Sequence, residues 1–215
     1  MPFAACWVKA DFWVIVRTSD GVAYPSGVVL DLSRDALVPE VRRRLAARTA
    51  RNAHVPGFLR AAVLVPLLFK EAAPYVLFTQ RSQHVETHKG QISFPGGMIE
   101  DTDDGPAAAA VRETEEEIGI PADQIELLGR LDELPTNTSS FVITPFVGTI
   151  PDGAASLTSD LEVARILEVP LAVLLDPANR ETDPRTGNWQ YLWEDAVIWG
   201  ATARILSGFL SILSP

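Results

Sequence analysis

The chain has 215 residues, of which 47% are hydrophobic and 21% charged, a composition typical of a globular protein rather than a disordered one. It carries 18 Lys and Arg against 28 Asp and Glu, a formal net charge of −10. A general nucleic-acid-binding protein needs a basic surface, so this class is excluded. Cys6 is the only cysteine, so no disulfide can form within the chain.

The apolar N-terminal stretch does not read as a membrane anchor or a signal. Lys9 and Asp11 interrupt it, and its uninterrupted runs are far below the ~20 residues of a membrane span. We therefore expect a cytoplasmic protein without a membrane partner. One domain over residues 1–215 accounts for the length, with residues 1–58 as an N-terminal extension.

The first part of the chain predicts strands on either side of a helix. Residues 11–32 predict two strands around a turn at 19–21. Residues 34–53 have helical spacing, with Pro39 suited to the first turn and an apolar stripe of Leu37, Val41 and Leu45. Two apolar runs joined by a turn, 60–69 and 75–81, then predict a pair of buried strands.

The second part mixes helices and strands. Residues 84–97 are loop-like and end in a glycine pair; a helix follows, with Asp103 or Asp104 as N-cap, Pro106 in its first turn and Gly119 just past its end. Beyond it we expect three strands, a short helix, another strand or hairpin and a final amphipathic helix, over residues 124–134, 141–150, 161–170, 170–176, 188–199 and 200–213. This order predicts a mixed α/β or α+β sandwich.

The helix before Gly119 ends in an unusual cluster of acidic residues, within the sequence RETEEEIGI. Carboxylates at a helix C-terminus are disfavoured by about 0.3–1 kcal/mol each, and like charges four residues apart add ~0.2–0.5 kcal/mol. On a helix Glu113, Glu116 and Glu117 share one face, while Glu115 points elsewhere. Mg²⁺ or Mn²⁺ bound to that face would offset the repulsion. A solvated acidic helix end is the alternative interpretation.

The surrounding residues resemble the Nudix box, G-x5-E-x7-R-E-U-x-E-E-x-G-U, in which U is aliphatic. The second half matches at Arg112, Glu113, Glu116, Glu117, Gly119 and Ile120. Thr114 stands where an aliphatic residue is usual, Gly97 is one residue too far from Arg112, and Asp104 occupies the place of the first glutamate. The resemblance implies a Nudix-type α/β/α sandwich with a mixed central sheet.

The segment before the box resembles the signature of the coenzyme A pyrophosphatases of this superfamily. The matching residues are Leu77, Thr79, Arg81, Ser82, Gly90, Phe94, Pro95, Gly96 and Gly97. The resemblance implies metal-dependent hydrolysis of coenzyme A or its thioesters to 3′,5′-ADP and 4′-phosphopantetheine or its acyl form. Glu86 stands where that signature usually has an arginine, which weakens the case for coenzyme A itself.

Roles follow for the individual residues. Glu113, Glu116 and Glu117 are expected to bind Mg²⁺ or Mn²⁺, and the resemblance adds the backbone carbonyl of Gly96. Arg112 would orient the glutamates by charge-assisted hydrogen bonds rather than touch substrate. The alternative for Arg112 is a surface salt bridge, and for the glycine pair an ordinary turn.

The general base and the substrate contacts are less constrained by the sequence. Glu162 is a candidate base, or otherwise an exposed residue at a strand start. Arg81 is a candidate phosphate ligand, with Lys89 as a possible substitute for the missing arginine. His84 and His88 read as surface histidines, and the tryptophans at 189, 193 and 199 read as core residues that could alternatively stack a base.

Two other functions remain open. One keeps the chemistry but acts on another nucleoside diphosphate derivative, such as ADP-ribose, a dinucleotide or a nucleoside triphosphate. The other is a catalytically silent nucleotide-binding module, against which the complete set of Glu113, Glu116 and Glu117 argues.

Overall fold

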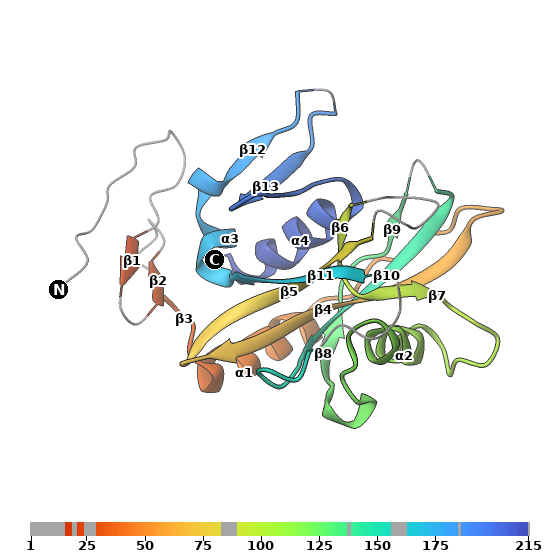
Figure 1. The fold of residues 1–215 in the computed structure, drawn as a ribbon, viewed down its shortest axis with the longest axis horizontal. Helices are drawn as coiled ribbons and strands as arrows, with labels where there is room; N and C mark the ends of the chain where they lie inside the picture. Colours follow the sequence, from red (N-terminus) through yellow and green to blue (C-terminus); the bar gives the residue numbers. More distant parts are fainter. Residues whose placement is uncertain are drawn as a thin grey trace.

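The structure is a computed structural model in which three layers, helix, sheet and helix, enclose the core (Figure 1). It describes the backbone of residues 16–18, 21–23, 29–82, 90–136, 139–155, 163–184 and 186–214. Within these residues no helix has both the length and the apolar character needed to cross a membrane.

The central sheet is mixed, as predicted. Its main path runs β11-β5-β4-β10-β8, with β6 attached to β5, β7 to β4 and β9 to β10. The middle strand β4 is parallel to β10 and antiparallel to β5, which makes the sheet mixed. The strands are β4 (Leu59–Lys70), β5 (Ala73–Arg81), β6 (Ile92–Ser93), β7 (Gly96–Met98), β8 (Glu126–Arg130), β9 (Leu134–Pro135), β10 (Phe141–Thr149) and β11 (Val163–Pro170).

Strand β4 is buried on both faces, which explains its almost uninterrupted apolar sequence. Successive side chains of a strand point to opposite faces. Leu64 and Leu68 join the cluster that contains Ile118 of helix α2 (Pro106–Ile118). The alternate residues, Val65 and Leu67, join the larger cluster formed with α1 (Arg34–Ala46), α3 (Leu171–Leu175) and α4 (Gly200–Leu213). Helix α2 therefore covers one face of the sheet, and α1 and α4 cover the other.

Helix α1 is shorter than predicted. Its stripe of Leu37, Val41 and Leu45 is buried as expected, but the helix ends at Ala46 instead of residue 53. The reason is tertiary: the carbonyl of Arg51 accepts a hydrogen bond from the backbone N–H of Glu133, which holds this segment against the turn after β8.

Pro39 lies in the second turn of α1, not in the first as predicted. Proline there has no N–H for the carbonyl of Asp35, four residues earlier. Both residues are exposed, so water can satisfy that carbonyl.

The described residues of the N-terminal extension contain one strand more than expected. Three strands, β1 (Val16–Thr18), β2 (Gly21–Ala23) and β3 (Val29–Asp31), form an antiparallel sheet of their own. Strand β1 pairs with β2, and β3 pairs with β2 on its other side; most of the predicted turn lies outside the described residues. A third strand provides pairing that a two-stranded hairpin lacks.

The C-terminal hairpin is also larger than predicted. Strands β13 (Trp189–Trp193) and β14 (Ala196–Ile198) pair as expected, and β12 (Arg180–Thr182) adds a third strand. Trp193 packs against the core, but Trp189 and Trp199 are 44% and 46% exposed, so their assignment to the core was wrong. Trp189 shares its strand side with the buried Tyr191, and its exposure belongs to its position at the first residue of β13. The described residues also contain the 3-10 helices η1 (Ala122–Gln124) and η2 (Pro177–Asn179).

Candidate metal and active site

Helix α2 begins and ends on glycine. Pro106 occupies its first turn and Gly119 ends it in the left-handed conformation (φ 70°), both as predicted. The N-cap, however, is Gly105 with φ 87°, and no side chain caps the helix. The prediction that Asp103 or Asp104 caps α2 was therefore wrong. Asp103 instead binds Arg112, nine residues further along the chain, as described below.

The buried face of α2 determines which of its glutamates are exposed. Ala109, Ala110, Thr114 and Ile118 face the sheet. The Thr114 hydroxyl donates to the carbonyl of Ala110 at 2.7 Å, which satisfies a polar group in a position where the box has an aliphatic residue. Glu115 and Glu116 are exposed, while Glu113 and Glu117 lie at the margin of the buried face and are partly buried.

Arg112 is the centre of a network at this margin. It donates from Nε and Nη2 to the two carboxylate oxygens of Asp103, at 2.9 and 3.0 Å, an arrangement that restrains the guanidinium in two directions. Its Nη1 donates to Glu113 at 3.0 Å and to Glu116 at 3.1 Å. Nη2 also reaches the carbonyl of Met98 at 3.1 Å, so the network joins α2 to β7.

Arg112 binds the carboxyls of Asp103 and Glu113, and the pKa values of these two groups shift in opposite directions. The side-chain hydrogen bonds from Arg112 lower the pKa of Asp103, whose side chain is only 4% exposed. Burial raises the pKa of Glu113, against the opposing influence of Arg112 and with added repulsion from Glu116 and Glu100. Asp103 raises the pKa of Arg112, which stays charged. A buried carboxylate such as Glu113 is a group that a cation would stabilise.

Glycine is required at each position of the pair for a different structural reason. Gly96 has φ +150°, and a Cβ there would lie 2.3 Å from the carbonyl oxygen of Ala62 in β4, so this position requires glycine for the strand pairing itself. A Cβ on Gly97 would lie 2.5 Å from both carboxylate oxygens of Glu113. Gly97 therefore leaves room for that carboxylate. The pair lies in β7, not in an ordinary turn.

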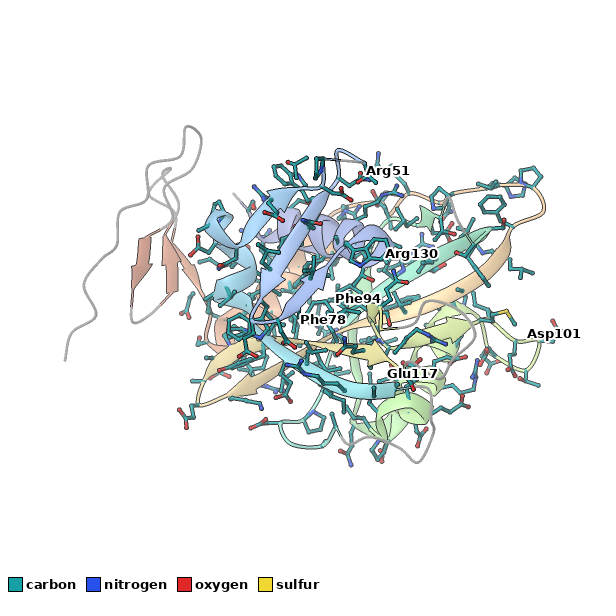
Figure 2. The ribbon with its side chains drawn as sticks, turned by 45° about the horizontal axis from the view of Figure 1, so that its top comes forward. Arg51, Phe78, Phe94, Asp101, Glu117 and Arg130 are labelled. Atoms are coloured by element: carbon teal, nitrogen blue, oxygen red, sulfur yellow. The ribbon has the colours of Figure 1, made fainter. Side chains whose placement is uncertain are left out.

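The segment before the glycines is anchored on the opposite face of the sheet. The ring of Phe94 stacks on Phe78 of β5 with 4.8 Å between centroids, and both rings are buried (Figure 2). The carbonyl of Pro95 accepts from the backbone N–H of Leu64 at 2.9 Å. These contacts hold the segment before the glycine pair against β4 and β5.

The structure thus brings together most of the residues expected at the site. Arg112, Glu113, Glu116, Glu117 and Gly96 lie on α2 and β7, two elements that pack against each other. Arg81 ends β5, and its backbone N–H donates to Gln91 O at 2.9 Å, in the segment that leads to β6. The other predicted residues, Lys89, His84, Glu86, His88 and Glu162, lie outside the described residues.

Two residues of the site were not found from the sequence in their present roles. Asp103, and not Asp104, binds Arg112; Asp104 is exposed. Counting back along the box from Arg112 reaches Asp104, but the extra residue between Gly97 and Arg112 shifts the partner by one position. The second residue whose role was not predicted is Gly97. No signal in the sequence distinguishes a glycine that makes room for a carboxylate from one that forms a turn.

The donor set fits a hard divalent cation in chemical type. Glu113, Glu116 and Glu117 supply carboxylate oxygens, the ligands that Mg²⁺ and Mn²⁺ prefer, and Gly97 leaves space beside one of them. Within the part of the chain that the structure describes, no three acidic, histidine or cysteine side chains already form a chelating group. Arg112 instead shares its Nη1 between Glu113 and Glu116.

An α/β/α sandwich with an Arg-Glu pair and two further glutamates on the helix after a glycine pair is the architecture of a Nudix hydrolase. The family model described as NUDIX domain matches residues 58–189 of the chain. The chain therefore belongs to the Nudix hydrolase family. Members of this family act on nucleoside diphosphate derivatives and generally use divalent metal ions.

Individual relatives agree with this assignment. The chain is 39% identical over 155 residues to the uncharacterised Nudix hydrolase NudL of Escherichia coli K12, an alignment that covers 68% of the chain and 79% of the relative. NudL of Escherichia coli O6:H1 aligns with the same values. Among solved structures, a MutT/nudix family protein from Enterococcus faecalis superposes with a TM-score of 0.51 and 15% identity, covering 84% of this chain and 71% of that one. At that identity the superposition supports the fold alone.

Proposed function

We propose that the protein hydrolyses the diphosphate bond of coenzyme A or its thioesters, giving 3′,5′-ADP and 4′-phosphopantetheine or its acyl form. The oxygen of a water molecule forms a bond to one phosphorus, and the bond from that phosphorus to the bridging oxygen breaks. The bridging oxygen leaves on the other phosphate. The observation that carries the hydrolytic activity is the Arg112 network, which joins the glutamates of α2 to strand β7. The choice of coenzyme A as substrate rests on the resemblance of residues 77–97 to the signature of its pyrophosphatases.

The proposed ligands of Mg²⁺ or Mn²⁺ are Glu113, Glu116, Glu117 and the backbone carbonyl of Gly96. When bound, the ion would neutralise the diphosphate and lower the pKa of a water molecule. The protein contributes a carboxylate, Glu113, that is held by Arg112 and bordered by Gly97. This restraint supports the proposal, because ligands that are already oriented lose less entropy on binding.

Arg112 and Asp103 act as positioning residues in this proposal. Asp103 binds the guanidinium through two hydrogen bonds, and Arg112 in turn restrains Glu113 and Glu116. Neither residue needs to contact the substrate. Their effect on the reaction passes through the orientation of the carboxylates.

The substrate contacts and the base are proposed from the sequence signature. Arg81, at the end of β5, would bind a phosphate group, and Lys89 would assist it. Glu162 would accept the proton of the attacking water. Arg81 leads directly into the residues that return to β6 and the glycine pair, which supports its assignment to the substrate side.

A panel of substrates tests the proposal. The full-length protein is incubated with coenzyme A, acetyl-coenzyme A, ADP-ribose, NADH and dinucleoside polyphosphates, in Mg²⁺ and in Mn²⁺, and the products are identified by mass. We expect 3′,5′-ADP from coenzyme A at the highest kcat/KM. Equal or faster turnover of the other substrates would overturn the coenzyme A assignment.

A second candidate is another nucleoside diphosphate derivative as substrate, which Glu86 favours because it replaces an expected arginine with a carboxylate. The same panel separates it from the first. A Glu117→Gln variant then tests the metal assignment for either substrate, because an amide is a poorer ligand than a carboxylate for a hard cation. Full activity in that variant would refute the role of Glu117, with Glu115→Gln as the exposed control on the same helix.

A further inference from the structure

A cavity of about 660 Å³ lies on the face of the sheet opposite α2. Helix α4 forms one wall, the segment after β8 another, and the start of β13 a third; Figure 2 shows Arg51 and Arg130 on this side of the molecule and Glu117 on the other. This volume is in the range of small-molecule sites. The lining residues that matter below are Arg48, Arg51, Asp132, Pro145, Trp189 and Arg204.

The cavity is distinct from the acidic face but close to it along the sheet. Glu113, Glu116 and Glu117 do not line it. Pro145 of β10, which does, pairs with Val63 of β4, and Val63 pairs with Gly96 of β7. These three residues form one row across neighbouring strands. Strands are about 4.8 Å apart, so the cavity wall lies roughly 10 Å from Gly96.

One wall offers an aromatic surface. Trp189 is 44% exposed, a large fraction for a tryptophan in a strand, and it lines the cavity. The guanidinium of Arg180 lies 4.3 Å from the ring centroid and covers one face of the indole. The cation restrains the ring, and Trp189 lines the cavity whereas Arg180 does not. Asn188, the neighbouring lining residue, adds a polar group beside it.

The cavity is also basic, although the whole chain carries a net charge of −10. Arg48 and Arg51 share one carboxylate, that of Asp132. Arg204 donates to the carbonyl of Pro135 at 3.4 Å and forms no ion pair within the described residues. The other lining carboxylate, Glu133, is engaged by Arg60 from outside the cavity. The charges of the lining side chains therefore favour an anionic ligand.

We infer that this cavity binds the nucleoside end of the substrate, with the base stacked on Trp189 and a phosphate of that end on Arg204. The inference rests on the proposed function, because it takes the diphosphate to lie at the acidic face and Gly96. The cavity wall at Pro145 lies roughly 10 Å from Gly96, so the cavity and Gly96 are close enough to take two ends of one substrate. Trp189 and Arg204 are then specificity-determining residues outside the family motif.

Binding of the nucleotide product tests this inference without turnover. The full-length protein is titrated with 3′,5′-ADP and with AMP in EDTA, and affinity is measured by calorimetry. We expect Trp189→Leu and Arg204→Gln each to weaken 3′,5′-ADP binding about ten-fold or more, since base stacking and charged contacts have this magnitude. Trp199→Leu is the matched comparator for the first variant, because Trp199 is equally exposed and does not line the cavity. Arg43→Gln, an exposed arginine on α1, is the comparator for the second.

Steady-state kinetics on the best substrate completes the test. We expect KM to rise about ten-fold in both variants with kcat unchanged, because these contacts are equal in the ground and transition states. Wild-type affinity and KM in Trp189→Leu and Arg204→Gln, or a loss confined to Trp199→Leu, would overturn the inference. If no diphosphate is hydrolysed but 3′,5′-ADP binding still depends on Trp189 and Arg204, the proposed function fails and the binding site stands.

Discussion

Asp103 illustrates how one residue acts on a site through another. Its carboxylate is almost buried and takes two hydrogen bonds from Arg112, which in turn restrains Glu113 and Glu116. Asp104, its neighbour, has the same chemistry but is exposed. The difference between the two is one of position alone, and it makes them a matched pair.

Asp103→Asn should lower kcat/KM about 10- to 100-fold and weaken activation by Mg²⁺ to a similar extent, because groups that orient metal ligands have effects of this size. The measurement is a Mg²⁺ titration of activity for wild type, Asp103→Asn and Asp104→Asn. We expect Asp104→Asn to behave as wild type. A loss in Asp104→Asn equal to that in Asp103→Asn would contradict the assignment of Arg112's partner.

Gly97→Ala should abolish most of the activity without unfolding the protein. The new Cβ would lie 2.5 Å from the carboxylate of Glu113, so that side chain must move, and a displacement of about 1 Å can cost about 100-fold in rate. Gly96→Ala is the contrasting variant. Its Cβ would meet the backbone of β4, and we expect a lower free energy of unfolding. Urea unfolding and activity together separate the two, and a Gly97→Ala enzyme with normal kcat would count against the site.

At the scale of elements, the turn between β4 and β5 carries residues that do not suit it. Lys70 pairs with Ala73, which leaves a two-residue loop of Glu71 and Ala72 with φ of 48° and 67°. Positive φ at both positions is typical of a type I′ turn, which favours Asn-Gly. Glutamate and alanine are both disfavoured at positive φ, so the loop stores conformational strain.

Replacing Glu71–Ala72 with Asn-Gly should raise the free energy of unfolding by about 1 kcal/mol. The turn lies at the end of β4 and β5 away from α2 (Figure 1), so activity should be unchanged. Urea denaturation followed by far-UV circular dichroism is the measurement. A decrease in stability would show that the two positive φ values do not limit this hairpin.

Glu40 of α1 gives a pH-dependent contribution to stability. Hydrogen bonds from Arg43 and then Arg44 lower the pKa of Glu40 from 4.5 to about 2. A depressed carboxyl pKa stabilises the folded state above pH 4.5, and that stabilisation is lost as the pH falls from 4.5 towards 2. The side chain is partly exposed, so solvent screening reduces the contribution to about 1 kcal/mol.

Glu40→Gln should therefore lower the free energy of unfolding by about 1 kcal/mol at pH 7, and the difference from wild type should shrink as the pH drops below 4.5. Urea unfolding at several pH values between 7 and 3 measures it. A difference that stays constant over this range would mean that the ion pairs do not cause it.

At the scale of the whole molecule, the core and the acidic face are separate. The apolar clusters lie between the sheet and its covering helices, whereas Glu116 is 57% exposed at the outer margin of α2. No core residue depends on a cation for its packing. Stability and metal-dependent activity should therefore respond differently to chelation.

Addition of EDTA should abolish diphosphate hydrolysis while lowering the midpoint of thermal unfolding by only a few degrees. Removal of the cation leaves a repulsion among the α2 carboxylates of about 1–2 kcal/mol, which corresponds to roughly 2–8 °C for a chain of this size. Differential scanning calorimetry with and without Mg²⁺ measures the shift. Global unfolding in EDTA would contradict the separation of core and site.

Much of the fold and of the site could be predicted from local pattern. The stripe of Leu37, Val41 and Leu45 is buried, β4 is a central strand, and Gly119 ends α2 in the left-handed conformation. These features depend on periodicity and on backbone freedom, which are properties of neighbouring residues. The end of α1 and the exposure of Trp189 could not be predicted in this way, because both depend on contacts with distant segments.

The sequence by itself determined the family, the mixed sandwich and the acidic face of α2, since the spacing of Arg112, Glu113, Glu116 and Glu117 fixes their common side of a helix. Only the tertiary structure decided which aspartate binds Arg112, why the second glycine of the pair is needed, and where a basic cavity lies. Each of these depends on β7, α2 or α4 packing beside an element remote in the chain. Spacing along a sequence carries no information about such distances.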